Sequence, residues 1–182
     1  SISLEDITNE IKWYINGSYN SSFDNKTIIS PKNITKGQNW RFELRVHDSY
    51  EWSTLTQSNN ITIQNTIPNI TTLIINSSSG QDHVTDNITC YFMVLDNDVE
   101  DLIVNYTWYK DEGGIPGFIN NTMSVINGTL YNITLNSSYT ASGEGFNCYI
   151  TPCDEEICGI PRPSEKITIG NKEPNVIYIN LN

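Results

Sequence analysis

Part of the sequence repeats within the chain, and this internal repeat limits the possible folds more than any other feature. Three pairs of segments match: residues 59–70 with 165–176 and 40–48 with 146–154 at an offset of 106, and 11–17 with 105–113 at an offset of 95. The change of offset indicates an insertion of 11 residues between the matching blocks. The chain is therefore expected to contain two copies of one domain type.

Both copies show the two-residue alternation of half-buried β-strands. Trp40, Phe42, Leu44 and Val46 fall on one side of a strand, and charged residues stand between them. Ala, the best helix former, occurs only at position 141. The second copy predicts seven strands, near residues 69–75, 87–95, 103–109, 121–126, 129–135, 145–151 and 165–170. Seven short strands predict an all-β sandwich of two antiparallel sheets.

Four Cys residues occur, at positions 90, 148, 153 and 158. An even number without the close ligand pairs of zinc sites favours disulfides. Of three possible connectivities we favour Cys90 with Cys148, on two strands expected to face the core, and Cys153 with Cys158, which close a short loop. Cys90, Trp108 and Cys148 then take the places of the two cysteines and the tryptophan of an immunoglobulin-like core.

The first copy is expected to lack its N-terminal strands. Trp13, the counterpart of Trp108, lies so early in the sequence that strand A and most of strand B are missing before it. Residues 173–182 match the first strand of a further copy. We therefore expect an incomplete immunoglobulin-like domain over 1–66, a complete one over 67–172, and in 173–182 the first strand of the next repeat.

A strand without a sheet of its own can complete a neighbouring domain by β-strand addition. We expect residues 173–182 to pair with the first domain of another copy, with Val176 and Tyr178 in its groove. The whole strand-donor interface is expected to comprise Val176, Ile177, Tyr178, Ile179 and Leu181. Repeated head to tail, this contact generates an open fibre. One giant chain of tandem repeats would make the same contacts and is the alternative.

The sequence holds 13 Asn-x-Ser/Thr triplets, about three times the number expected by chance from its 24 Asn, 18 Thr and 17 Ser residues. They begin at Asn16, Asn20, Asn25, Asn33, Asn60, Asn69, Asn76, Asn87, Asn105, Asn120, Asn127, Asn132 and Asn136. We interpret them as N-glycosylation sites, whose glycans would hydrate a chain with only 17% charged residues. Glycans and disulfides together predict an extracellular location, at a cell surface or in a secreted filament.

The net charge of −11 argues against binding to nucleic acid or to anionic membrane surfaces. No apolar run approaches the ~18 residues of a membrane span, and no signal peptide opens the sequence. We expect a mature segment or a piece of a longer chain, with no membrane insertion in this segment.

Four motifs resemble the tandem immunoglobulin-like repeats, related to PKD and cadherin-like modules, of very long archaeal and bacterial surface proteins. They are LDNDVED (95–101), YTWYK (106–110), GEGFNCYITPCD (143–154) and ITIGNKEP (167–174). The resemblance covers nearly the whole chain and implies a surface or adhesion stalk. Because these are scaffold motifs, the resemblance says little about any ligand.

The acidic loop of Asp96, Asp98, Glu100 and Asp101 resembles the calcium-binding loops of cadherin-like modules. Calcium takes six to eight oxygen ligands, and closely spaced carboxylates supply them. A calcium site at Asp96, Asp98 and Asp101, with Asp154 as a further partner, is therefore one prediction. A solvated acidic loop without metal is the other, since the glycine and distal glutamate of an EF-hand are absent.

Enzyme activity is the least supported class. Asp154, Glu155 and Glu156 could be the paired acids of a glycosidase, but a tight disulfide loop leaves no cleft between them. With two histidines, no convincing Ser/His/Asp set is present. We expect no enzymatic function and no cofactor besides glycans and the calcium considered above.

The leading functional prediction is a structural subunit or segment of a heavily N-glycosylated extracellular filament or stalk, assembled head to tail from copies of itself. The competing prediction is a cell-surface adhesin whose repeats bind carbohydrate or protein. Tyr50 and Trp52, in a turn, could stack on sugar rings in that case.

Overall fold

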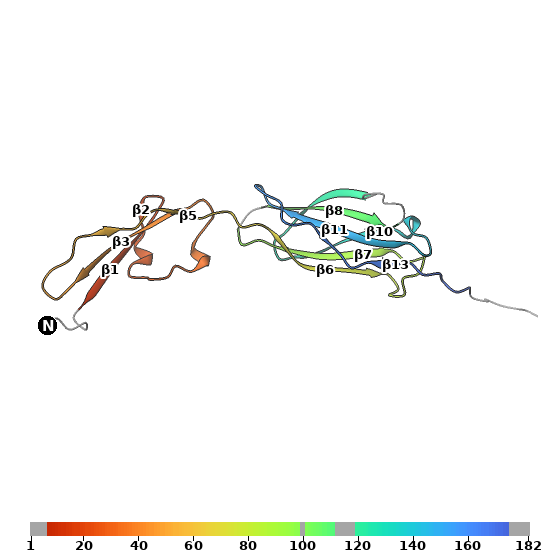
Figure 1. Cartoon of the computed structure of the whole chain (residues 1–182), viewed down its shortest axis with the longest axis horizontal. Helices are drawn as coiled ribbons and strands as arrows, with labels where there is room; N and C mark the ends of the chain where they lie inside the picture. Colours follow the sequence, from red (N-terminus) through yellow and green to blue (C-terminus); the bar gives the residue numbers. More distant parts are fainter. Residues whose placement is uncertain (1–6, 99–100, 112–118, 175–182) are drawn as a thin grey trace, which may run out of the picture. The chain divides into compact units, whose positions relative to one another are not determined.

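The computed structural model describes residues 7–98, 101–111 and 119–174 (Figure 1). The described residues form β-strands, 3-10 turns and loops, and none of them lies in an α-helix. No helix in these ranges has the length and hydrophobicity of a membrane span. The chain divides into two compact units, residues 1–65 and 66–182, which are described separately.

The second unit consists of two antiparallel sheets. The first has the order β10-β7-β6, formed by β6 (Asn69–Ser77), β7 (Ile88–Leu95) and β10 (Leu130–Leu135). The second has the order β12-β11-β8-β9, formed by β8 (Leu102–Lys110), β9 (Ile119–Val125), β11 (Gly145–Cys153) and β12 (Arg162–Pro163), and β13 (Ile167–Thr168) also pairs with β11. In Figure 1, β8 and β11 lie over β6 and β7. The seven predicted strands are present, with the last (165–170) reduced to β13, and β12 is a short additional strand that the sequence did not predict.

The core of the second unit lies between the two sheets. Trp108 stands opposite Cys148 on the neighbouring strand and is 1% exposed. Cys90 and Cys148 are fully buried and form a disulfide that joins the two sheets. Two sheets joined by a buried disulfide beside a tryptophan form an immunoglobulin-like sandwich. The all-β fold and this disulfide, both predicted from the sequence, are confirmed.

The first unit contains a single sheet among its described residues. Its order is β2-β1-β3-β4, formed by β1 (Thr8–Ile15), β2 (Ser18–Tyr19), β3 (Asn39–His47) and β4 (Thr56–Gln57), and β5 (Ile61–Thr62) also pairs with β3. By the repeat, β1 corresponds to β8, and β3, β4 and β5 correspond to β11, β12 and β13. No described residues of the first unit correspond to the β10-β7-β6 sheet.

Individual hydrogen bonds repeat at the offset of 106 found in the sequence. The backbone N–H of Phe42 donates to the hydroxyl of Ser58, and the N–H of Cys148 donates to that of Ser164. Gly37 donates to the Ile63 carbonyl as Gly143 donates to the Ile169 carbonyl, and both glycines have a left-handed φ, of 80° and 89°. The two units are therefore copies of one strand arrangement, as the sequence predicts.

The first unit differs from the sequence-based expectation in one respect. We expected strand A and most of strand B to be missing, but a counterpart of β10 is also missing among the described residues. The segment between β2 and β3 instead forms two 3-10 turns, η2 (Ser21–Phe23) and η3 (Pro31–Asn33). The whole connection from β1 to β3 (16–38) is 11 residues shorter than that from β8 to β11 (111–144), and the part of it that follows β2 forms 3-10 turns in place of a strand.

The apolar face of the first sheet is covered at one end only. Phe23 of η2 packs against Trp40 at a ring distance of 5.4 Å, and Trp40 is 2% exposed. Phe42 and Leu44 are half-buried, and Val46 at the other end of β3 is 40% exposed. The alternation predicted for β3 is therefore correct, but its apolar side lacks a facing sheet among the described residues.

Candidate modification and binding sites

All 13 sequon asparagines lie at the surface. Eleven are exposed, and Asn20 and Asn87 are half-buried. Asn105 and Asn132 lie on the outer sides of their sheets, as the strand alternation predicts, so a glycan on either would leave the core undisturbed. Access is therefore compatible with glycosylation at each position.

Several of these asparagines also have a structural task. Asn16 and Asn25 have left-handed φ values of 50° and 58°, which Asn tolerates better than most residues. Their side-chain oxygens accept hydrogen bonds from the backbone N–H groups of Asn39 and Ile11, respectively. These bonds use Oδ1 and leave Nδ2, the atom that a glycan would occupy. At Asn16 and Asn25, the geometry of the turn is therefore a sufficient reason for Asn, without glycosylation.

Asn127 differs because both atoms of its amide hold the backbone. Its Oδ1 accepts from the N–H of Asp96 at 3.1 Å, and its Nδ2 donates to the carbonyl of Asp96 at 2.6 Å. This pair of bonds fastens the β9–β10 turn to the end of β7. A glycan on Nδ2 would compete with the second bond.

Replacing Asn127 with Asp is expected to destabilise the second unit by about 1 to 3 kcal/mol, because a carboxylate oxygen then faces the Asp96 carbonyl without a donor. Chemical denaturation of protein made without glycosylation measures this cost. Asn33→Asp, at an exposed position, is the matched control and should change stability by less than about 0.5 kcal/mol. Equal effects of the two substitutions would show that the clamp contributes nothing.

Two sequons face each other across β8 and β9, which the sequence did not reveal. In the strand register, Asn105 pairs with Thr122 and Thr107 pairs with Asn120. The Thr122 hydroxyl donates to Asn105 Oδ1 at 2.7 Å, and these residues line a shallow pocket of about 460 Å³. Only the pairing of the two strands brings these sequons together, so residue spacing alone carried no signal for it.

The acidic loop binds the start of the second unit. Asp96 and Asp98 both accept from the Thr66 hydroxyl, at 2.7 and 2.8 Å, and Asp98 also accepts from the Thr66 N–H. Asp101 is exposed, and no group of three metal-ligating side chains occurs among the residues that the structure describes. Two carboxylates bound to a threonine fall short of the six to eight oxygens of a calcium site. Glu100 of this loop lies outside the described residues, so calcium at this loop stays a prediction.

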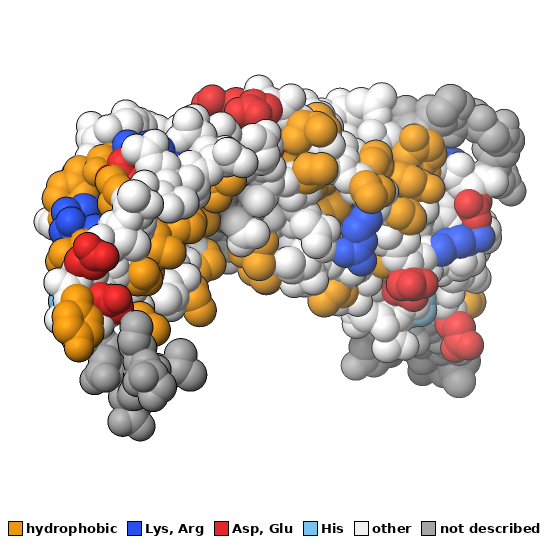
Figure 2. Space-filling model, turned by 60° about the vertical axis from the view of Figure 1, so that its left-hand side comes forward, with side chains coloured by type: hydrophobic (Ala, Val, Ile, Leu, Met, Phe, Trp, Pro, Cys, Tyr) orange, Lys and Arg blue, Asp and Glu red, His pale blue; other side chains and the backbone are white. Residues whose placement is uncertain are grey.

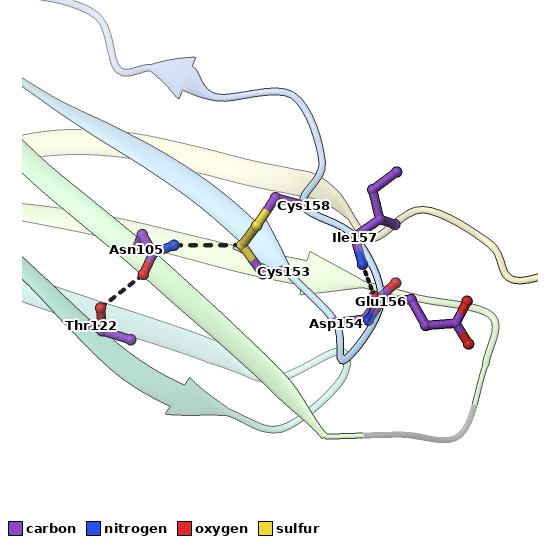
Figure 3. The surroundings of a disulfide bond; sticks show 7 residues. All are labelled: Asn105, Thr122, Cys153, Asp154, Glu156, Ile157 and Cys158. Carbon is purple, nitrogen blue, oxygen red and sulfur yellow. Dashed lines mark hydrogen bonds between the residues drawn. A yellow bond between two sulfur atoms is a disulfide. The ribbon is translucent and has the colours of Figure 1, made fainter.

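A second disulfide closes the hairpin after β11, as predicted. Cys153 and Cys158 are bonded, and Asp154 Oδ1 accepts from the N–H groups of Glu156 and Ile157, both at 2.6 Å (Figure 3). Asp154 is buried, and in Figure 3 the Glu156 carboxylate points away from the disulfide. The Asp154 carboxylate organises this turn, so it does not support the paired acids of a glycosidase.

The first unit has the same hairpin with an aromatic pair in place of the disulfide. Asp48 accepts from the N–H groups of Tyr50 and Glu51, as Asp154 does one repeat later. Trp52 stands at the position of Cys158 and packs on His47, with ring centres 4.9 Å apart. Trp52 is 43% exposed. Its position in the repeat gives Trp52 a structural task in the hairpin.

The outer face of the first sheet carries a network of charged and aromatic side chains. Arg41 pairs with Glu43 at 2.8 Å and lies over the ring of Tyr14, whose hydroxyl donates to Glu43 at 2.7 Å. The hydrogen bond from Arg41, followed by that from Tyr14, lowers the pKa of Glu43. The same carboxylate raises the pKa of Tyr14. These charges satisfy one another within the sheet, so the network acts as a cross-strand brace.

Removing the Cys153–Cys158 disulfide is expected to cost about 2 kcal/mol, because it closes a loop of only five residues and loop-closure entropy grows with length. Thermal unfolding of the Cys153→Ser/Cys158→Ser variant measures the loss. The control is Glu155→Gln, because Glu155 is exposed in the same loop. A substitution of a buried residue, such as Phe146→Tyr, would not serve as a control. A loss of more than about 4 kcal/mol would contradict the entropic account.

The expected strand-donor residues Val176, Ile177, Tyr178, Ile179 and Leu181 lie outside the described residues.

Comparison with known proteins does not assign this chain to a family. No protein-family model matches the sequence, and no curated protein is similar to it. Among solved structures, the chicken interferon gamma receptor alpha chain is similar over 92% of this chain and 87% of its own, with 10% identity and a TM-score of 0.48.

Two fibronectin-type structures are also similar. Domains FN1–FN3 of chicken CNTN1 match over 91% of this chain and 57% of their own, with 11% identity and a TM-score of 0.39. The segment of two fibronectin type-III domains from chicken tenascin matches over 88% and 83%, with 15% identity and a TM-score of 0.37. The immunoglobulin-like assignment rests on the strand order, the disulfide and the core described above.

Proposed function

We propose that this chain is a structural segment of an N-glycosylated extracellular stalk or filament, in which the one-sheeted first unit is completed by β-strands of a neighbouring repeat. The observation that carries the proposal is the difference between the two units. The same strand arrangement is closed by a second sheet in one copy and has no facing sheet among the described residues of the other. The surface sequons and two disulfides support an oxidising, extracellular setting.

The open face has the chemistry of a missing sandwich core. Trp13 packs on Trp40 and Phe42 at ring distances of 6.0 and 5.3 Å, and Val46 is 40% exposed on the same side of the sheet. An apolar sheet face of this kind favours burial against another sheet. Copies of this chain, or adjoining repeats of one longer chain, are the proposed source of that sheet.

Strand β6 of the second unit indicates which side chains of a donated first strand would face the core of the acceptor domain. In β6, a bulge at Ile70–Thr72 shifts the alternation, so that Ile70, Leu73 and Ile75 face the core. Residues 173–182 repeat this strand at the offset of 106. By that correspondence Val176, Ile179 and Leu181 would face the groove, and Tyr178 would face outward, which revises the expectation for Tyr178.

Sedimentation velocity of the full chain tests the proposal. Ile179→Asp would bury a charge in the groove and is expected to weaken association about tenfold or more. Tyr178→Asp is the matched control and should assemble like the unaltered chain. Equal assembly of both variants would exclude strand donation. A denatured subunit mass far above 20.6 kDa plus glycans would instead indicate one long tandem-repeat chain.

The adhesin is the second candidate because Tyr50 is 86% exposed beside Trp52 at the tip of a hairpin. A glycan array with a defined ligand whose binding is abolished by Tyr50→Ala would favour it. Trp52→Ala is less informative, since the Trp52 ring also packs on His47 and lies under the guanidinium of Arg45.

A further inference from the structure

The outer face of the β10-β7-β6 sheet carries exposed hydrophobic side chains that the sandwich core does not use. Ile74 is 50% exposed, Leu95 is 44% exposed and Leu130 is 58% exposed. Tyr91 and Met93 lie half-buried on the same face, on the central strand β7. On the face of the molecule in Figure 2, hydrophobic side chains lie among polar and charged ones. These apolar side chains stand beside polar ones on the same face, and burying their exposed part would be favourable.

Three sequon asparagines stand on this same face. The strand register places Asn132, Tyr91 and Ile74 in one row across the sheet. The next row is Thr134, Thr89 and Asn76, and Asn69 stands opposite Leu95. Asn69, Asn76 and Asn132 are all exposed. They therefore flank the hydrophobic side chains on both outer strands.

From this arrangement we infer that N-linked glycans on Asn76 and Asn132 cover the hydrophobic outer face of the β10-β7-β6 sheet. Directly opposed residues of antiparallel strands have Cβ atoms about 5 Å apart, so a sugar on Asn132 starts next to the Tyr91 ring. The C–H side of a pyranose ring is apolar and packs on such a surface, while its hydroxyls face water. The inference rests on the proposed glycosylation and names the task of two sites.

The opposite outer face of the same unit provides the contrast. There β8 and β9 present mostly polar side chains, including Asn105, Thr107, Asn120 and Thr122. A glycan on Asn120 adds bulk to a surface that is already hydrated. Sugars on the two faces are thus expected to have different consequences, although all the asparagines have the same sequon.

The test uses the full chain secreted from a host that attaches N-glycans, with glycopeptide mass spectrometry to measure occupancy. Asn76→Gln/Asn132→Gln is expected to give a several-fold rise in the fluorescence of a hydrophobic dye, together with light scattering above that of the unaltered chain. The matched control Asn120→Gln should change neither. Adding Ile74→Thr and Leu130→Thr to the first variant should restore low dye binding, because these changes make the uncovered face polar.

Each outcome has a distinct meaning. Dye binding and association that do not change after the loss of occupied Asn76 and Asn132 glycans would overturn the inference. Glycans elsewhere but none at these two sites would overturn it while leaving the proposed glycosylation intact, and a chain without glycans would overturn both. Self-association of the fully glycosylated chain that Ile74→Thr abolishes would show that a second copy covers this face instead.

Discussion

Replacing Cys90 and Cys148 with Ala is expected to lower the unfolding free energy of the second unit by about 4 kcal/mol. The disulfide spans 58 residues, and a loop of that length loses much conformational entropy when it is closed in the unfolded chain. Total stabilities of single domains are about 5 to 15 kcal/mol, so this loss removes a large part of the margin. Urea denaturation followed by far-ultraviolet circular dichroism measures it.

The second disulfide is the control for this prediction. Cys153→Ser/Cys158→Ser removes a bond of the same chemistry that spans only five residues, and about half the loss is expected. If both variants lose the same stability, loop-closure entropy is not the source of the effect. If the Cys90/Cys148 variant has the same free energy of unfolding as the unaltered chain, the buried disulfide does not contribute to the stability of the sandwich.

Trp108→Ala is expected to destabilise the second unit by about 3 to 5 kcal/mol. Trp108 is 1% exposed and stands between the two sheets beside Cys148, so truncation removes apolar contacts and leaves a cavity. Calorimetric unfolding of the full chain should show one transition shifted strongly downward. The transition of the first unit should stay in place, because Trp108 lies in the second unit only.

Trp52→Ala is the matched substitution for Trp108→Ala. Trp52 is 43% exposed, and its packing consists of His47 and the guanidinium of Arg45 at 4.4 Å. Loss of an exposed cation–π contact costs about 0.5 to 1 kcal/mol. A Trp52 effect as large as that of Trp108 would mean that the hairpin of the first unit belongs to its core.

Sequence-based predictions were correct where the pattern involves residues close together in the sequence, and failed where it depends on residues far apart. Strand alternation is set by neighbouring residues, so β3, β7, β8 and β11 were located to within a few residues. The disulfides followed from cysteines on predicted core strands and in a short loop. The missing counterpart of β10 was not foreseen, because the 11-residue difference between the two copies shows that residues are absent from the first but not which element they would have formed.

The candidate sites were predicted only as positions. Sequons identified 13 asparagines, but their spacing does not distinguish Asn127, whose amide holds Asp96, from Asn132, whose side chain faces the Tyr91 row. The calcium prediction used the spacing of Asp96, Asp98 and Asp101 along the chain. In the structure, two of these carboxylates bind Thr66, which comes from a segment 30 residues earlier.

The sequence by itself determined the all-β class, the two copies of one strand arrangement, the cystine pairs and the sequon positions. Each of these depends on residue type and on the period of a single strand. Only the tertiary structure decided that one copy has a single described sheet, that a bulge resets the inward side of β6, and that sequons border the hydrophobic face around Tyr91. These features arise from cross-strand register, which hydrogen bonds between distant residues establish and which no local pattern records.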